Sequence, residues 1–390
     1  MSGRLLPLPL FALVLALALA VTFGATPLRP RDAGIDALFA TVPAAPTDTV
    51  AVVDIDGAAL ALHGPWPWPW PRGRIAALLD ALWQRGARVV AFDIAFVGPD
   101  RRSAAAVVAD LPAAPDKADR AVLERLFPDG DALLAQAMAG GDAVLGLLAD
   151  PSGEAPPPPA PPFHAGAVLP AAPARVAGLT PPFAPLLDQS AATGVMALGL
   201  DGAGVIRDVP LLVALPRAAF GGLALEAARV SLGYPEIVLA GDARLGLGSL
   251  SLPIDGRALL RLHAQGAAAE RARTVRAAAL LDGTAPAEGI AGRIVLVGSS
   301  SPALGALRAV PGNPYRPSVQ IQADAVGQIL AGVNYIRSPA ALVFDGLAVI
   351  AAVLGALVAA RRLPVPAGVA AIAAGAVVLV GAAALLVLRG

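Results

Sequence analysis

The residues best suited to chemistry lie in the run VVDIDGAAL, where one residue separates Asp54 from Asp56. This D-x-D-G spacing is typical of phosphatases whose first carboxylate attacks phosphorus and whose second transfers a proton, while a magnesium ion neutralises charge. Those enzymes also need a hydroxyl residue after the next strand and a downstream lysine. Here the next strand runs into FDIAF, and the only lysine, Lys117, lies in the polar run PDKADR. A metal-dependent periplasmic phosphohydrolase using Asp54 and Asp56 is therefore an alternative, not the leading hypothesis.

A third carboxylate, Asp93, also lies late on a predicted strand. If these strands are parallel, Asp54, Asp56 and Asp93 share the carboxyl edge of a sheet, where open α/β folds bind ligands. Such carboxylates could instead cap a neighbouring helix or pair with an arginine such as Arg72 or Arg74. The sequence leaves both interpretations open.

A run of three serines after Gly298 follows another predicted strand. Its backbone N–H groups could bind an anion, or the run could be a polar turn. The three histidines share no metal-ligand spacing, and the sequence has no glycine-rich nucleotide loop, so no catalytic residue, metal or cofactor is expected. The candidate ligand-binding residues are Asp54, Asp56, Arg72, Asp93, Ser299, Ser300 and Arg308.

The elements that must position these residues alternate between strands and helices within the region 30–338. TVAVVDID (49–56) and ARVVAFDIAF (87–96) predict strands, and the apolar stripe between them predicts a helix over 73–85. This β-α-β unit implies parallel strands with a right-handed crossover. We therefore expect an α/β fold with a mostly parallel sheet covered by helices and flanked by transmembrane helices. Further helices are predicted over 131–139, 274–282 and 322–331, and further strands in AVLGLL (143–148) and RIVLVG (293–298).

Two antiparallel hairpin additions are predicted from turn dipeptides. Asp201-Gly202 lies inside GVMALGLDGAGVIRDVPLLV, and Asp255-Gly256 lies between LSLPI and RALLRL. Both dipeptides favour tight hairpin turns. The run PSGEAPPPPAPP (151–162) favours neither helix nor strand, so we expect a stiff exposed loop there.

The stretch GPWPWPWPR (64–72) precedes the predicted helix over 73–85. Each proline pushes the tryptophan before it toward extended geometry, so Trp66, Trp68 and Trp70 lie along a stiff ribbon. We interpret this ribbon as a structural clamp against the fold.

Three apolar segments are long enough to cross a membrane, over residues 5–23, 340–360 and 365–388. The first could instead be a signal peptide, because an A-x-A pattern lies near its end. Its length favours an uncleaved anchor. Basic residues near the segments are balanced between the two sides, but a charged flank before the first segment favours export of region 30–338. We expect a multi-pass inner-membrane protein with this region extracytoplasmic.

The composition of the chain excludes some partners. Hydrophobic residues make up 56% of the 390 residues, which is more than ordinary soluble proteins contain. The 29 basic side chains are balanced by 29 acidic ones and form no basic patch, so no nucleic-acid partner is expected. Cysteine is absent, which excludes disulfides and thiolate metal sites without deciding the compartment.

An ordered series of motifs resembles a known family. The stretch from VAVVDIDGAAL through GPWPWPWPR to AFDIAFVGPD, followed by GVIRDVPLL and AGRIVLVGSSSPALGALRAVPGNPYRPSVQIQADAVGQILAG, looks like the CHASE domain of type two. That family comprises extracellular sensors associated with cyclases and histidine kinases. The resemblance covers residues 30–338. It implies an extracytoplasmic sensory input region of a membrane-anchored receptor, with a cyclase or kinase output module outside this chain.

The sequence departs from the family pattern at several positions. The family has acidic residues where Gly57 and Gln320 stand, an Asp where Ala306 stands and a His where Gln322 stands, and it has one Trp-Pro pair fewer. These changes weaken the case for a charged ligand in the last motif. The resemblance implies an unidentified small-molecule or ionic signal, and we expect a homodimer. We also expect the receptor to continue past Gly390, since the chain ends directly after an apolar run.

Overall fold

The computed structural model describes residues 30–62, 70–154, 169–200, 204–216, 218–240 and 243–336, with Pro159, Phe163 and a few positions between 343 and 358. Two compact units divide the chain, one formed by Met1–Pro43 with Tyr335–Gly390 and the other by Ala44–Asn334. In the first unit, helix α2 (Pro30–Phe39) ends in Phe39, whose ring centroid lies 4.8 Å from that of Tyr335.

No helix in the described ranges is long and apolar enough to cross a membrane. The segments 5–23 and 365–388 lie outside the described residues, and 340–360 is described at scattered positions only. The membrane segments therefore stay predictions.

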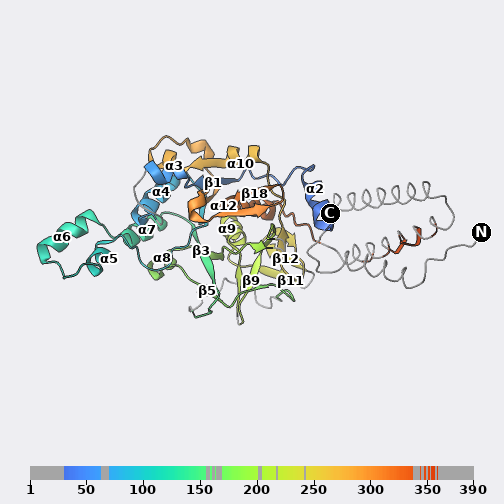
Figure 1. The fold of residues 1–390 in the computed structure, drawn as a ribbon, viewed down its shortest axis with the longest axis horizontal. Helices are drawn as coiled ribbons and strands as arrows, with labels where there is room; N and C mark the ends of the chain where they lie inside the picture. The colour runs from blue at the N-terminus through green and yellow to red at the C-terminus, as the bar shows by residue number, and fades with distance from the viewer. Residues whose placement is uncertain are drawn as a thin grey trace, which may run out of the picture. The chain divides into compact units, whose positions relative to one another are not determined.

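A largely parallel seven-stranded sheet forms the centre of the second unit (Figure 1). Every neighbouring pair is parallel except β3 with β5, which confirms the predicted sheet type. The strand of this sheet that comes last in the chain, β16, lies between β1 and β2, so the crossover from β1 to β2 passes over it. In sheet order the strands are β15 (Thr274–Arg276), β1 (Val50–Asp54), β16 (Ile294–Gly298), β2 (Val89–Phe92), β3 (Ala143–Asp150) and β5 (Gly178–Thr180), with β6 (Ala192–Val195) also paired to β3.

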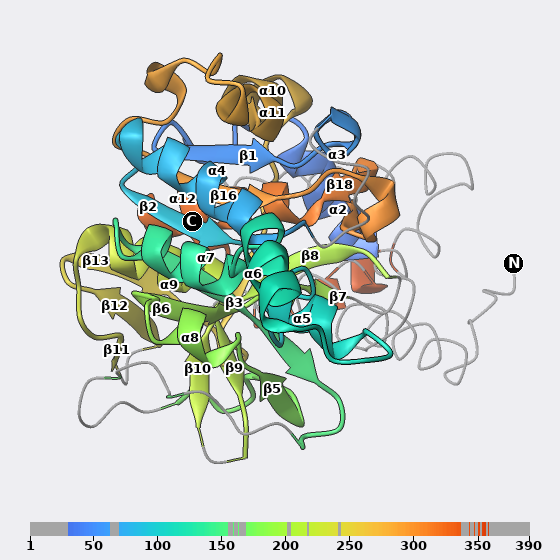
Figure 2. The same ribbon diagram turned by 90° about the vertical axis from the view of Figure 1, so that its left-hand side faces the viewer.

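One face of the sheet is covered by the helices that connect its strands. Helix α4 (Arg72–Gln84) packs beside α7 (Gly130–Met138), and Figure 2 shows the two side by side in front of the strands. The predicted apolar stripe of α4 is buried on this face together with Trp70, which is 2% exposed. Shorter helices complete the layer: α3 (Gly57–Leu62), α8 (Ala184–Leu187) and α11 (Ala277–Leu281).

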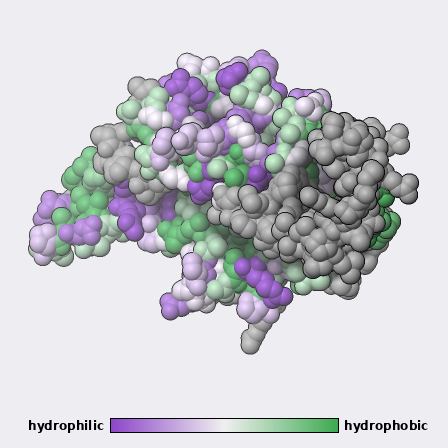
Figure 3. Space-filling view, turned by 45° about the vertical axis from the view of Figure 1, so that its right-hand side comes forward, coloured by the Kyte–Doolittle hydropathy of each residue, from purple (hydrophilic) through white to green (hydrophobic). Residues whose placement is uncertain are grey.

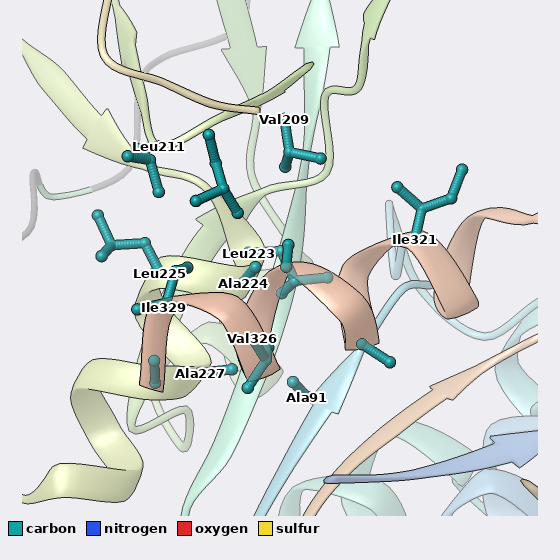
Figure 4. Close-up of a cluster of buried hydrophobic side chains, with 14 of the residues drawn as sticks. Ala91, Val209, Leu211, Leu223, Ala224, Leu225, Ala227, Ile321, Val326 and Ile329 are labelled. Carbon is teal, nitrogen blue, oxygen red and sulfur yellow. The ribbon is translucent and has the colours of Figure 1, made fainter. Parts of the chain in front are cut away.

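The opposite face carries α9 (Leu223–Leu232) and α12 (Ser318–Leu330). Figure 4 shows their apolar side chains meeting, among them Leu223, Val326 and Ile329. Helix α12 lies very close to β16, because a Cβ added at Gly298 would be 2.6 Å from the Cβ of Val319. Only glycine allows this approach of helix to strand.

Small antiparallel sheets extend the fold beyond the central sheet. Strand β8 (Ile206–Pro210) pairs with β7 (Gly199–Leu200), which confirms the first predicted hairpin, although its turn lies outside the described residues. The remaining strands are β4 (Ala174–Arg175), β9 (Leu212–Ala214), β10 (Ala219–Gly221), β11 (Val238–Ala240), β12 (Arg244–Leu247), β13 (Leu250–Pro253), β14 (Leu259–Arg261), β17 (Leu307–Val310) and β18 (Asn313–Pro317).

The second predicted hairpin is wrong. Strand β13, before Asp255-Gly256, pairs with β12, while β14, after it, pairs with β8. Asp255 still shapes a turn, since its Oδ1 accepts the backbone N–H of Arg257 at 3.0 Å. The turn therefore sends the chain to another sheet instead of folding it back on β13.

The predicted helix over 274–282 is also only partly present. Residues 274–276 form edge strand β15, and helix begins at Ala277. Helix α10 (Ala267–Arg273) precedes this strand. The branched Thr274 and Val275 favour strand, and pairing with β1 overrides the helical pattern.

Helices α5 (Ala104–Ala109) and α6 (Lys117–Leu126) project from the sheet layers beyond α7 (Figure 1). Helix α6 has no buried residue, and Leu126 is 65% exposed. Figure 3 shows apolar and polar surface next to one another on this projection. No sequence pattern predicted this pair of projecting helices.

Candidate functional site

Asp54 lies at the carboxyl end of β1, beside the turn that follows β16. Its Oδ1 accepts the backbone N–H of Ser300 at 2.7 Å, and its Oδ2 accepts the Ser300 hydroxyl at 2.6 Å. Burial raises the pKa of Asp54, while the two hydrogen bonds from Ser300 oppose the rise. Both carboxylate oxygens are thus engaged by one serine, an arrangement that holds the turn to β1 and does not suit an attacking nucleophile.

Asp56 both caps a helix and pairs with an arginine. Its Oδ1 accepts the backbone N–H of Ala59 at 2.7 Å in the first turn of α3. Its Oδ2 accepts from Nε of Arg276 at 2.9 Å. The arginine partner comes from β15 and not from the start of α4, as the sequence had suggested.

Arg72 lies apart from the other candidates, in a buried clamp at the start of α4. Its Nη1 pairs with Asp131 and its Nη2 donates to the carbonyl of Gly98 at 2.6 Å. Its guanidinium lies 5.7 Å from the ring centroids of both Phe96 and Phe183. These contacts hold a loop to α4 and α7, so Arg72 is placed to stabilise the fold.

The other candidates meet at a pocket of about 540 Å³ at the carboxyl ends of β2, β3 and β6. This volume is within the range of small-molecule sites. Apolar walls come from the ends of the strands and from the turn before β17. The polar lining residues are Asp93, Ser299, Arg308 and Ser318, and the larger apolar ones are Ile94, Leu147, Leu148, Met196, Leu198, Ile206 and Leu304.

Asp93 is the central polar group of this pocket. Its backbone N–H donates to Val297 on β16 at 2.9 Å, and its Oδ2 accepts the hydroxyl of Ser318 at 2.5 Å. Burial raises the pKa of Asp93 to about 6, while the Ser318 hydrogen bond and the charge of Arg308 oppose the rise. The carboxyl therefore changes its charge close to neutral pH, as functional groups in pockets often do.

Arg308 and Ser299 differ in how far the fold engages them. Arg308 is exposed on β17, and its Nη1 donates to the carbonyls of Gly305 at 2.6 Å and Leu307 at 2.9 Å. The Ser299 hydroxyl donates to the Ile55 carbonyl at 2.6 Å and accepts from Ser301 N–H at 3.0 Å. Ser299 thus shapes the turn as the polar-turn interpretation expected, whereas Arg308 presents charge at the pocket.

The sequence patterns missed Ser318, which links the pocket to α12. Ser318 is the first residue of that helix and its hydroxyl reaches Asp93. The Pro317-Ser318 pair at the start of a long apolar run is the signal that could have indicated a helix start. Its partner could not be found this way, because Asp93 and Ser318 are separated by 225 residues.

A second, smaller polar hollow of about 310 Å³ lies on the other side of β1. Its lining includes Asp54, Thr274 and Gln320. Behind it, buried Asp324 accepts from Arg273 at 2.7 Å and from Arg316 at 2.6 Å. This ion network ties α10, β18 and α12 together. Within the described ranges, no group of acidic, histidine or cysteine side chains is arranged to hold a metal ion.

The pocket of Asp93 has the volume of a small-molecule site, and its central polar contact is the hydrogen bond from Ser318 to Asp93. The family model described as CHASE2 domain matches residues 11–361. Among curated proteins and solved structures, none matches the chain. The chain therefore belongs to the CHASE2 domain family, whose members are extracellular sensory domains.

Proposed function

We propose that this chain is the extracytoplasmic sensory input region of a membrane-anchored signal transduction receptor, whose cyclase or kinase output module lies outside these residues. The observation that carries the proposal is the Asp93–Ser318 contact, because it joins the wall of a ligand-sized pocket to the first residue of α12. Membership of the CHASE2 domain family supports the sensory role.

Helix α12 is suited to transmit the state of the pocket. It begins at Ser318 and ends at Leu330, shortly before the apolar segment 340–360. A ligand that favours one arrangement of Asp93 and Ser318 shifts the population of α12 positions toward that arrangement. At saturating ligand, the free energy of this equilibrium changes by the difference between the ligand's binding free energies for the two arrangements.

Anchoring rests on the sequence. The apolar segments 5–23, 340–360 and 365–388 give a multi-pass inner-membrane protein with region 30–338 outside. A homodimer is the simplest assembly for a receptor of this kind. Sedimentation of the purified full chain in detergent tests the homodimer directly.

The sensory role is tested on the full chain purified in detergent from its host. Native mass spectrometry should find a small molecule bound at one per chain, and Asp93→Asn should reduce its occupancy. Arg257→Gln is the matched surface control, since Arg257 pairs with Asp255 on a distant turn. A chain with no bound small molecule, and no thermal shift with any metabolite pool, would contradict the proposal.

A phosphatase assay with magnesium separates the sensor from the alternative hydrolase. The engagement of both Asp54 oxygens by Ser300 supports the absence of turnover. Phosphate release that Asp54→Asn abolishes would overturn the proposed function.

A further inference from the structure

Two opposite charges at the pocket of Asp93 retain unused hydrogen-bonding capacity. Asp93 lines the pocket, and within the described part of the chain its carboxylate accepts only from Ser318, through Oδ2, so no hydrogen bond there uses Oδ1. Arg308 uses only Nη1, for two carbonyls of its own hairpin. A carboxylate and a guanidinium with remaining lone pairs and N–H groups line the same pocket.

The apolar walls exclude a bare ion as the natural ligand. Leu147, Met196 and Ile206 face the same space as Asp93 and Arg308. A hydrated cation or phosphate would leave this apolar surface in contact with water, whereas an apolar body would remove it from water. The ligand must therefore carry charge at one end and an aliphatic group at the other.

One charge on the ligand would satisfy only half of the site. An amine would pair with Asp93 and leave the Arg308 charge without a carboxylate, and an acid would do the reverse. Opposite charges on one small ligand let both charge-assisted hydrogen bonds form together.

Resting on the proposed sensory function, we propose that the pocket binds a compact zwitterion of the amino-acid class, with its ammonium group on Asp93, its carboxylate on Arg308 and an aliphatic side chain against the apolar wall. The ammonium group holds Asp93 in its charged form. A charged Asp93 accepts more strongly from Ser318 and fixes the first turn of α12. Binding therefore acts on the helix that leads to segment 340–360.

Calorimetry on the full chain in detergent with four probes tests the ligand class. L-leucine carries all three features, isopentylamine lacks the carboxylate, 4-methylpentanoate lacks the ammonium group, and glycine lacks the aliphatic body. L-leucine should bind about 10-fold to 100-fold more tightly than each of the other three, since each lacks one charged hydrogen bond or the apolar contact.

Two variants assign the ends of the ligand. Asp93→Asn should weaken L-leucine and isopentylamine by about 10-fold or more and leave 4-methylpentanoate unchanged. Arg308→Gln should weaken L-leucine and 4-methylpentanoate and leave isopentylamine unchanged. Arg257→Gln should change none of the four affinities. Unchanged melting temperatures would show that each variant still folds.

The pH dependence gives a readout that a merely structural Asp93 would not produce. Because free Asp93 is partly protonated near pH 6 and the ammonium group favours its charged form, L-leucine binding should release protons there. Its affinity should fall below pH 6 in the native chain and stay level in Asp93→Asn.

Two classes of result would overturn the inference. Equal affinity for L-leucine and isopentylamine, or for L-leucine and 4-methylpentanoate, would show that one charge suffices. If no probe binds while native mass spectrometry finds a ligand of other chemistry, the zwitterion is wrong and the sensory role stands. If no probe binds and no ligand is found, both fail.

Discussion

At the scale of single residues, Gln322 is a buried side chain without hydrogen bonds. It is 0% exposed on α12, and neither its Oε1 nor its Nε2 has a partner in the described structure. Replacing an unsatisfied buried amide by an apolar group of similar shape removes its desolvation cost. We expect Gln322→Met to raise the free energy of unfolding by about 1–3 kcal/mol, measured by urea denaturation.

Gln328, further along α12, is the matched control. It is 1% exposed, but its Oε1 accepts from His263 N–H at 2.8 Å and its Nε2 donates to the Arg261 carbonyl at 3.1 Å. Gln328→Met should therefore lower the free energy of unfolding. If both variants lost stability alike, Gln322 would have partners of its own.

The raised pKa of Asp93 makes stability depend on pH. The folded protein holds this proton up to about pH 6 and the unfolded chain only to about 3.8, so the stabilising contribution is complete below 3.8 and is lost as pH rises through 6. Asp93→Asn does not titrate. The free energy of unfolding of Asp93→Asn minus that of the native protein should grow between pH 4 and 7, by at most about 3 kcal/mol.

Denaturation of both proteins at a series of pH values measures this difference. Asp54 and Glu226 also have raised pKa values, but they are present in both proteins and cancel. Asp110→Asn, at an exposed helix end, is the control and should follow the native curve. Parallel curves for Asp93→Asn and the native protein would show that Asp93 has no such role.

At the scale of elements, the close approach of α12 to β16 is set by one glycine. A Cβ at Gly298 would lie 2.6 Å from the Cβ of Val319, so helix or strand must move. We expect Gly298→Ala to lower the free energy of unfolding by about 1–3 kcal/mol, as overpacking does. Thermal melting measures the loss.

Gly57 gives the comparison, since nothing lies within 4 Å of a Cβ built there. Gly57→Ala at the start of α3 should leave the melting temperature unchanged or slightly higher. A Gly298→Ala protein as stable as native would mean that α12 shifts without loss, and that its position is not fixed by the sheet.

The ribbon before α4 should be tested at the tryptophan that the structure describes. Trp70 is 2% exposed and packs in the cluster under α4 and α7. Trp70→Ala should lower the free energy of unfolding by about 3–5 kcal/mol, measured by urea denaturation. Leu126→Ala on the exposed face of α6 should change it little. Unchanged melting in Trp70→Ala would exclude the clamp; Trp66 and Trp68 lie outside the described residues.

The sequence predicts the elements that local pattern determines. Buried runs such as Val50–Asp54 and the apolar stripe of α4 carry their own periodicity, so the parallel sheet and its helices followed from them. Strand β15 and the pairing of β14 with β8 did not, because short segments take their structure from distant partners.

Some of the candidate site residues could be predicted from the sequence and others could not. Asp93, Ser299 and Arg308 were candidates and do line one pocket. Arg72 was a candidate and lies in a separate clamp with Asp131. Positions at the end of a strand are readable from sequence, whereas the partner of an arginine depends on tertiary packing.

At the scale of the whole molecule, the proposed topology makes a direct prediction. Alkaline phosphatase fused after residue 338 should be active in a bacterial host, because the fusion point follows the exported region, and a fluorescent protein fused there should be dark. A fusion after residue 362, in the basic turn between the last two apolar segments, is the control and should give the opposite pair of signals. An inactive alkaline phosphatase and a fluorescent reporter after residue 338 would show that the chain has the opposite orientation in the membrane.

The position of β16 between β1 and β2 has a consequence for biosynthesis. During synthesis, β1 and β2 emerge long before β16, the strand that lies between them. The hydrogen-bond partner of Asp54, Ser300, is made 246 residues after it. A nascent chain that stops before Ile294 has two apolar strands with a strand-wide gap between them, open to proteases and to strands of other chains. Such long-range pairing also slows folding. The domain should therefore acquire protease resistance in a single late step, once β16 has left the ribosome.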